Sequence, residues 1–109
     1  MAISSHVLDT SRGVPAAGLA VALDVRQGSE WRNIGRRTTD QDGRVKSFSD
    51  AALAAGTYRL TFETASYHRG AGVTPFFPEV VVTFEIASGD RCHVPLLLSP
   101  FGYSTYRGT

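Results

Sequence analysis

The side chains of this sequence best suited to acid–base chemistry are its histidines, because imidazole titrates near neutral pH. There are three: His6 in SHVLD, His68 in SYHRG and His93 at the start of HVPLLLS. Their spacing contains neither the H-x-H nor the H-x-x-x-H pair that is typical of metal sites, and Cys92 is the only cysteine. We therefore expect no metal site and no intrachain disulfide, which leaves general acid–base catalysis as the chemistry to consider.

His93 is the strongest candidate for a general base. If HVPLLLS is a strand, the face that carries His93 also carries Pro95 and Leu97, which makes it too apolar to lie in water. A second subunit would cover such a face. A histidine beneath that cover is partly desolvated and near its neutral form, as a base working close to pH 7 must be. The alternative is a hydrogen-bonded interface histidine with no part in catalysis.

His6 and Arg44 are weaker candidates when each is taken alone. His6 lies in a strand-like segment, where a histidine on the polar face commonly bonds to solvent or backbone. Arg44 follows the turn Asp-Gln-Asp-Gly, where an arginine is commonly a solvated side chain, although a guanidinium also suits an oxyanion. We expect His68 in a surface loop outside the site. Covalent serine catalysis is not expected, because Tyr106 replaces the second glycine of the G-x-S-x-G motif in GYSTYRG.

The elements that position these residues are predicted to be mostly strands. Period-two alternation of apolar residues runs through residues 19–26, 58–64, 79–86 and 93–99, and turn signals rich in Gly, Pro and Asp separate these segments. The segment SFSDAALAAG, with Ser49 as N-cap and Gly56 as its stop, predicts one short helix. Strands at this spacing favour an antiparallel β-sandwich.

Length and charge exclude several classes of protein. The 109 residues, 42% of them hydrophobic, fit one domain spanning residues 1–109. A net charge of +1 with scattered charged residues gives no footprint for nucleic acid or for a membrane surface. The start of the chain has no signal-peptide pattern, and the single cysteine fits a reducing compartment, so we expect a cytoplasmic protein.

Four segments in order resemble the transthyretin-like protein family, and within it the 5-hydroxyisourate hydrolases of urate degradation. They are HVLDTSRGVPAAGLAVAL, TDQDGR, FFPEVVVTFEI and HVPLLLSPFGYSTYRGT, and they cover nearly the whole chain. The resemblance implies an all-β fold, a transthyretin-like antiparallel β-sandwich of about eight strands with one short helix. It also implies a homotetramer built as a dimer of dimers, with the active site in the cleft between the dimers.

The same resemblance implies a role for each matching residue. His6, Arg44 and His93 would be catalytic, and His6, Arg44, Tyr106 and Thr109 would bind the substrate. The tail motif is Tyr106, Arg107, Gly108 and Thr109. The implied reaction is cyclic-amide hydrolysis of the small molecule 5-hydroxyisourate to 2-oxo-4-hydroxy-4-carboxy-5-ureidoimidazoline, by histidine-activated water with arginine stabilisation of the oxyanion and without a cofactor. The alternative is a non-catalytic transthyretin-like carrier of a small ligand. A β-sandwich interaction module is a third reading that fold alone does not exclude.

Two positions depart from the family pattern. Thr109 stands where the family has Ser, which keeps the hydroxyl but adds a methyl group and a stiffer χ1. Arg91 stands where many relatives have a second histidine before His93. We expect Arg91 to make the site more positive without altering the assignment of His93.

Overall fold

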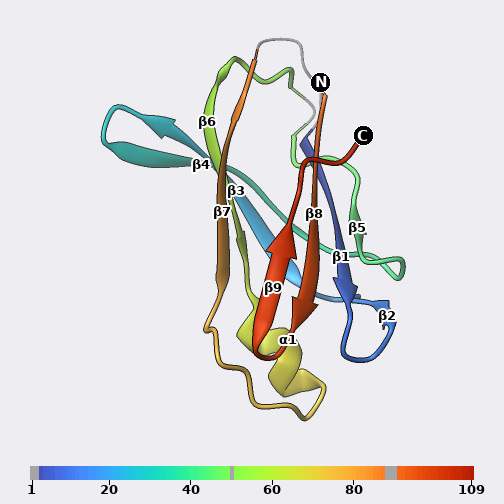
Figure 1. The fold of residues 1–109 in the computed structure, drawn as a ribbon. Coiled ribbons are helices and arrows are strands. Elements are labelled where there is room, and N and C mark those ends of the chain that lie inside the picture. Colours follow the sequence, from blue (N-terminus) through green and yellow to red (C-terminus); the bar gives the residue numbers. More distant parts are fainter. Residues whose placement is uncertain (1–2, 50, 88–90) are drawn as a thin grey trace.

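A computed structural model describes residues 3–49, 51–87 and 91–109, which form two packed β-sheets with a short helix at one end (Figure 1). The first sheet has the order β2-β1-β8-β9, and β5 also pairs with β1. Its strands are β1 (Ile3–Asp9), β2 (Val14–Pro15), β5 (Arg44–Val45), β8 (Cys92–Ser99) and β9 (Gly102–Thr105). The second sheet has the order β4-β3-β6-β7, with strands β3 (Ala20–Gln27), β4 (Glu30–Thr38), β6 (Gly56–Phe62) and β7 (Val80–Ile86). The predicted all-β sandwich with one short helix is confirmed.

The core lies between the sheets and is built from the alternating residues of each long strand. In β3, Val21 and Leu23 are fully buried, and in β6 Leu60 and Phe62 are as well. From the other sheet, β8 contributes the buried residues Val94, Leu96 and Leu98, and β1 contributes Val7. Each such side chain contributes about 1.5–3 kcal/mol by leaving water. The alternation predicted for these segments therefore corresponds to their buried rows.

Strands β1 and β8 run parallel, whereas the other strand pairs in the described ranges are antiparallel. Figure 1 shows these two strands side by side, although they come from opposite ends of the chain. Their register pairs Ile3 with Cys92 and continues without a break to Asp9 with Leu98. This pairing sets which residues of the two segments become neighbours.

The helix predicted in SFSDAALAAG is wrong. The described residues of that segment, 47–49 and 51–56, contain no helix, and residue 50 lies outside the described ranges. Phe48 is buried in the core, and the Ser47 hydroxyl donates to Ser49 O at 2.7 Å. The Ser49 hydroxyl accepts from Ala51 N–H at 3.1 Å, as an N-cap would, but no helix follows. Core burial and these local hydroxyl bonds outcompete the helix propensity of the alanines.

The helix forms instead at α1 (Thr64–Gly70), between β6 and β7. His68 is 3% exposed on the inner side of α1, together with Thr64 and Ala65. The prediction that His68 lies in a surface loop is therefore wrong. Its side chain packs edge-on against Tyr67, with 5.5 Å between the ring centroids.

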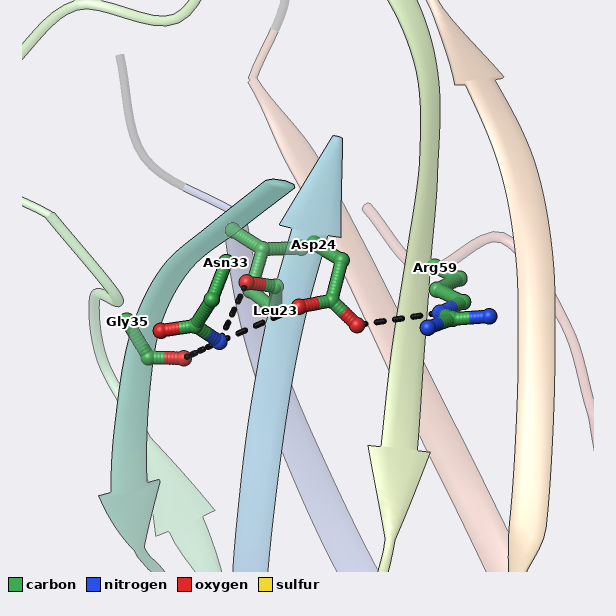
Figure 2. Close-up of polar contacts among 5 residues, drawn as sticks. All are labelled: Leu23, Asp24, Asn33, Gly35 and Arg59. Carbon is green, nitrogen blue, oxygen red and sulfur yellow. Dashed lines mark hydrogen bonds and ion pairs between the residues drawn. The ribbon is translucent and has the colours of Figure 1, made fainter. Parts of the chain in front are cut away.

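Strand β4 was not anticipated, because its side chains are mostly exposed and alternate weakly. Polar contacts across the outer side of the sheet hold it in place (Figure 2). Asn33 Nδ2 donates to Leu23 O at 3.3 Å and to Asp24 Oδ1 at 3.1 Å, beside a register shift between Leu23 and Asp24. Asp24 Oδ2 accepts from Arg59 Nε at 2.9 Å, and the Arg59 guanidinium lies 4.4 Å from the centre of the Trp31 ring.

No helix in the described part of the chain is long and apolar enough to span a membrane.

Candidate active site

The strand register brings the three predicted catalytic residues together. His6 of β1 pairs with Arg44 of β5 on one side and with Pro95 of β8 on the other. His93 lies opposite Ser4, two residues before His6 on the same strand face. Residues that are far apart in sequence therefore meet on the outer face of the first sheet.

A pocket of about 330 Å³ opens on this face. It is lined by Ser4, Ser5, Arg44, Val45, Lys46, Arg91, His93 and Thr109. Three of these side chains carry a positive charge, and no described lining residue is Asp or Glu. An electrostatic environment of this kind favours an anion, or a neutral group that becomes negative during a reaction. Nowhere in the described residues do three His, Cys, Asp or Glu side chains cluster as metal ligands would.

The turn before Arg44 is held by Asp40. Its carboxylate Oδ1 accepts from the backbone N–H of Asp42 at 2.9 Å and of Arg44 at 3.0 Å. The hydrogen bond from Arg44 N–H, together with the nearby positive charges, keeps the pKa of Asp40 below its usual value. Gly43 has φ +76°, and a Cβ there would lie 2.4 Å from Val7 O, so the turn requires glycine. The guanidinium is thus carried by a loop fixed against β1.

His6 is oriented by the same turn. Its Nε2 lies 2.8 Å from the backbone oxygen of Asp42. Because a carbonyl oxygen only accepts, Nε2 carries the proton, and neutral His6 keeps its lone pair on Nδ1. His6 adjoins the pocket through its pairing with Arg44 but is not among the described residues that line it.

His93 is held at two edges of its ring. Nδ1 lies 2.8 Å from the Ser4 hydroxyl. On the other edge the backbone of Gly108 approaches so closely that a Cβ there would lie 2.5 Å from Cδ2, and Gly108 N–H donates to His93 O at 2.8 Å. Burial lowers the pKa of His93, and the charges of Arg44 and His6 lower it further. The imidazole of His93 therefore stays neutral down to a lower pH than an unperturbed histidine does.

The tail reaches two different pockets. Thr109 lines the pocket of His93 and Arg44. Tyr106 and Arg107 line a separate pocket of about 250 Å³ between the edges of the two sheets, next to Cys92 and Glu85. Within one chain the structure thus brings Thr109 to the predicted site but not Tyr106, which is 57% exposed. Contact between Tyr106 and substrate stays a prediction.

Sequence reasoning missed Ser4 and Lys46 as pocket residues. A signal was available for each of them, because Ser4 lies two positions before His6 and Lys46 two positions after Arg44. Strand residues two apart share a face. Arg91, noted only as a departure from a family pattern, also lines this pocket.

The fold and pocket together define a transthyretin-like β-sandwich with a cationic, histidine-bearing cleft. The family model described as HIUase/Transthyretin family matches residues 3–108, and the chain belongs to that family. It is 43% identical to a 5-hydroxyisourate hydrolase of Salmonella dublin over 98% of this chain and 80% of that protein.

Two solved structures share the fold over nearly their full length. One is the 5-hydroxyisourate hydrolase of Klebsiella pneumoniae, with a TM-score of 0.88, 39% identity and full coverage of both chains. The other is sea bream transthyretin in complex with thyroxine, with a TM-score of 0.93 and 28% identity, covering 100% of this chain and 96% of that one. The fold is therefore common to a 5-hydroxyisourate hydrolase and to a thyroxine-bound transthyretin, and the side chains of the site must distinguish them.

Proposed function

We propose that this protein hydrolyses 5-hydroxyisourate in urate degradation, to 2-oxo-4-hydroxy-4-carboxy-5-ureidoimidazoline. One observation carries the proposal: Arg44, His93 and Thr109 line a single pocket in a chain 39–43% identical to named 5-hydroxyisourate hydrolases. The reaction opens a cyclic amide, which requires an activated water molecule and a stabilised oxyanion. The pocket offers a group for each of these tasks.

His93 is the better placed of the two histidines to act as general base. Its pKa is lowered by burial and by nearby positive charge, so it is neutral and able to take a proton from water at neutral pH. His6, whose Nε2–H is engaged with Asp42 O, would orient the water through its Nδ1 lone pair, and protonated His93 would then return its proton to the leaving nitrogen. Each role is worth about 10²–10⁴ in rate.

Arg44 supplies the positive charge beside the developing oxyanion. Its planar fork suits carbonyl and anionic oxygens of a flat purine-derived ring. Lys46 and Arg91 add charge to the same pocket, which favours an electron-poor, acidic substrate. The Thr109 hydroxyl would hydrogen-bond the ring and limit its orientations.

The assembly proposed with this function is a homotetramer, a dimer of dimers. On the outer face of β8, His93 and Leu97 remain partly exposed, whereas Pro95 is already buried within the chain, so the part of this face that a second dimer would cover is the part around His93 and Leu97. A second dimer on that face would close the pocket and bring Tyr106 of another copy within reach of substrate. No cofactor enters the proposed reaction, and a cytoplasmic location is proposed with it.

A substrate-decay assay tests the function directly. Purified protein added to freshly generated 5-hydroxyisourate should speed the loss of its ultraviolet absorbance well beyond the spontaneous rate. Absence of acceleration at micromolar protein would refute the hydrolase. It would favour the carrier reading that the likeness to thyroxine-bound transthyretin supports, and equilibrium binding of thyroxine would then be measured on the same sample.

Arg44 should affect both rate and pH dependence. Arg44→Lys keeps the charge but loses the planar fork, so we expect kcat/KM to fall at least about tenfold, or ~1.4 kcal/mol. Arg44→Gln also removes a charge that lowers the pKa of His93. The pKa of His93 should then rise, so that the imidazole is neutral over a narrower pH range. The acid limb of the kcat/KM profile should therefore move to higher pH.

Rate profiles from pH 5 to 9 on both variants check this prediction. In the unaltered protein the acid limb should lie below about pH 6.5, the usual imidazole value. Arg44→Lys is the matched control, since it should lower the rate without moving the limb. An unmoved limb in Arg44→Gln would remove His93 from the role of base.

Gly108→Ala should reduce activity with little loss of stability. The added Cβ would lie 2.5 Å from His93 Cδ2, so either the imidazole or the tail must move. We expect kcat/KM to fall about tenfold or more. Gly102→Ala is the control, because its Cβ would meet Ser99 Oγ at an ordinary 3.7 Å. Equal activity of the two variants would mean that the position of the tail does not matter to His93.

A further inference from the structure

We propose that Ser4 is a positioning residue, which accepts a hydrogen bond from Nδ1–H of His93 and so directs the Nε2 lone pair toward the pocket. The inference rests on the proposed function, because it gives Ser4 a part in the same reaction. In this role Ser4 acts on the reaction through His93.

The strand pairing places the two residues together. Ser4 and His93 are partners in the parallel register of β1 and β8, and Ser4 Oγ lies 2.8 Å from Nδ1. Both side chains are half-buried and both line the pocket. The preceding and following pairs, Ile3 with Cys92 and Ser5 with Val94, fix the spacing on either side. The contact is thus part of a continuous ladder.

The two edges of the imidazole next to Cγ are both occupied. Ser4 holds the Nδ1 edge, and the Gly108 backbone lies against the Cδ2 edge. The far end of the ring, Cε1 and Nε2, is the part that remains for the pocket. A ring clamped in this way can react only through Nε2, and Nε2 is a base only when Nδ1 carries the proton.

A hydroxyl and a carboxylate can both accept Nδ1–H from His93, but they affect the charge of the ring differently. The hydroxyl accepts Nδ1–H from neutral imidazole and from imidazolium alike, so the ring need not turn when Nε2 gains and then releases a proton. Unlike Asp or Glu, it adds no negative charge that would favour the charged imidazole. This agrees with a pocket where neutral His93 is already favoured by burial and by Arg44. Ser4 therefore orients the base without making it cationic.

Kinetics of Ser4 variants form the first part of the test. Ser4→Ala should lower kcat about tenfold or more with KM changed less than about twofold, while Ser4→Thr, which keeps the hydroxyl, should recover most of kcat. The matched control is Thr10→Val, which removes another hydroxyl bond between the same segments, from Thr10 Oγ1 to Leu98 O at 3.1 Å. It should lower thermal stability and leave kcat unaltered. Unchanged kcat in Ser4→Ala would overturn the proposal.

The second part is independent of turnover. Long-range ¹H–¹⁵N spectra of the imidazoles, with the His93 signals identified by their loss in His93→Asn, should show the Nδ1–H tautomer in the unaltered protein. In Ser4→Ala the Nε2–H tautomer should gain population. An Nε2–H tautomer before substitution, or the same tautomer in both proteins, would overturn the proposal. These spectra need no substrate. If the protein proved inactive, the proposed function would be refuted, but the spectra would still show whether Ser4 sets the tautomer of His93.

Discussion

His93→Asn should lower kcat/KM by about 10²–10⁴-fold while the protein remains folded. The asparagine amide can occupy the position of Nδ1 and keep the bond to Ser4, but it has no atom in the place of Nε2. The substitution therefore removes the proposed base with little change at the sheet. Steady-state decay of 5-hydroxyisourate gives the rate, and thermal denaturation checks the fold.

Ser99→Ala is the matched control for His93→Asn. Ser99 lies at the other end of β8, where its hydroxyl donates to Gly102 O at 3.0 Å. Ser99→Ala should leave kcat/KM within about twofold of the unaltered protein, because a substitution away from the pocket usually has a small effect. If His93→Asn were as active as Ser99→Ala, the chemistry would have to lie elsewhere.

Removal of residues 106–109 should abolish measurable activity and leave a folded chain. The deletion takes Thr109 out of the pocket and the Gly108 backbone away from His93. It spares β9, whose pairing with β8 ends at Thr105, and the bond from Thr105 Oγ1 to Pro95 O at 2.7 Å. We expect the melting temperature to fall by only a few degrees, about 1 kcal/mol of unfolding free energy.

Circular dichroism, thermal melts and the decay assay on the truncated chain check this expectation. Loss of cooperative unfolding would make the tail a structural element instead of a wall of the site. Full activity would exclude any role for Thr109 and Gly108. Gly108→Ala offers the finer comparison, since it keeps every tail side chain and changes only the approach to His93.

The fold was predictable to the extent that burial alternates along the chain. Strands β3, β6, β7 and β8 each place one row of apolar residues in the core, and this row is visible in the sequence. Strand β4 has no such row and is held by cross-strand polar contacts, which no local pattern reveals. The misplaced helix has the opposite cause, because a strong local signal in SFSDAALAAG loses to burial of Phe48.

The site was predictable in its chemical groups and less so in its arrangement. Arg44, His93 and Thr109 were named from sequence and line one pocket. The spacing of Ser4 from His6 could have placed it on the face of the site, but its contact with His93 depends on the register of β1 against β8, and nothing within either segment specifies that register. Tyr106 illustrates the reverse case, since one chain places it in the neighbouring pocket.

The parallel pairing of β1 with β8 has a consequence for the order of folding. Ser4 and His93 are 89 positions apart, so the loop closure that joins them is among the costliest in the chain. During synthesis at the ribosome, β1 can pair early with β2 and β5, but its parallel partner β8 emerges only after β3, β4, β6 and β7 have been made. Because such long-range pairing slows folding, we expect the β1–β8 pair to form late.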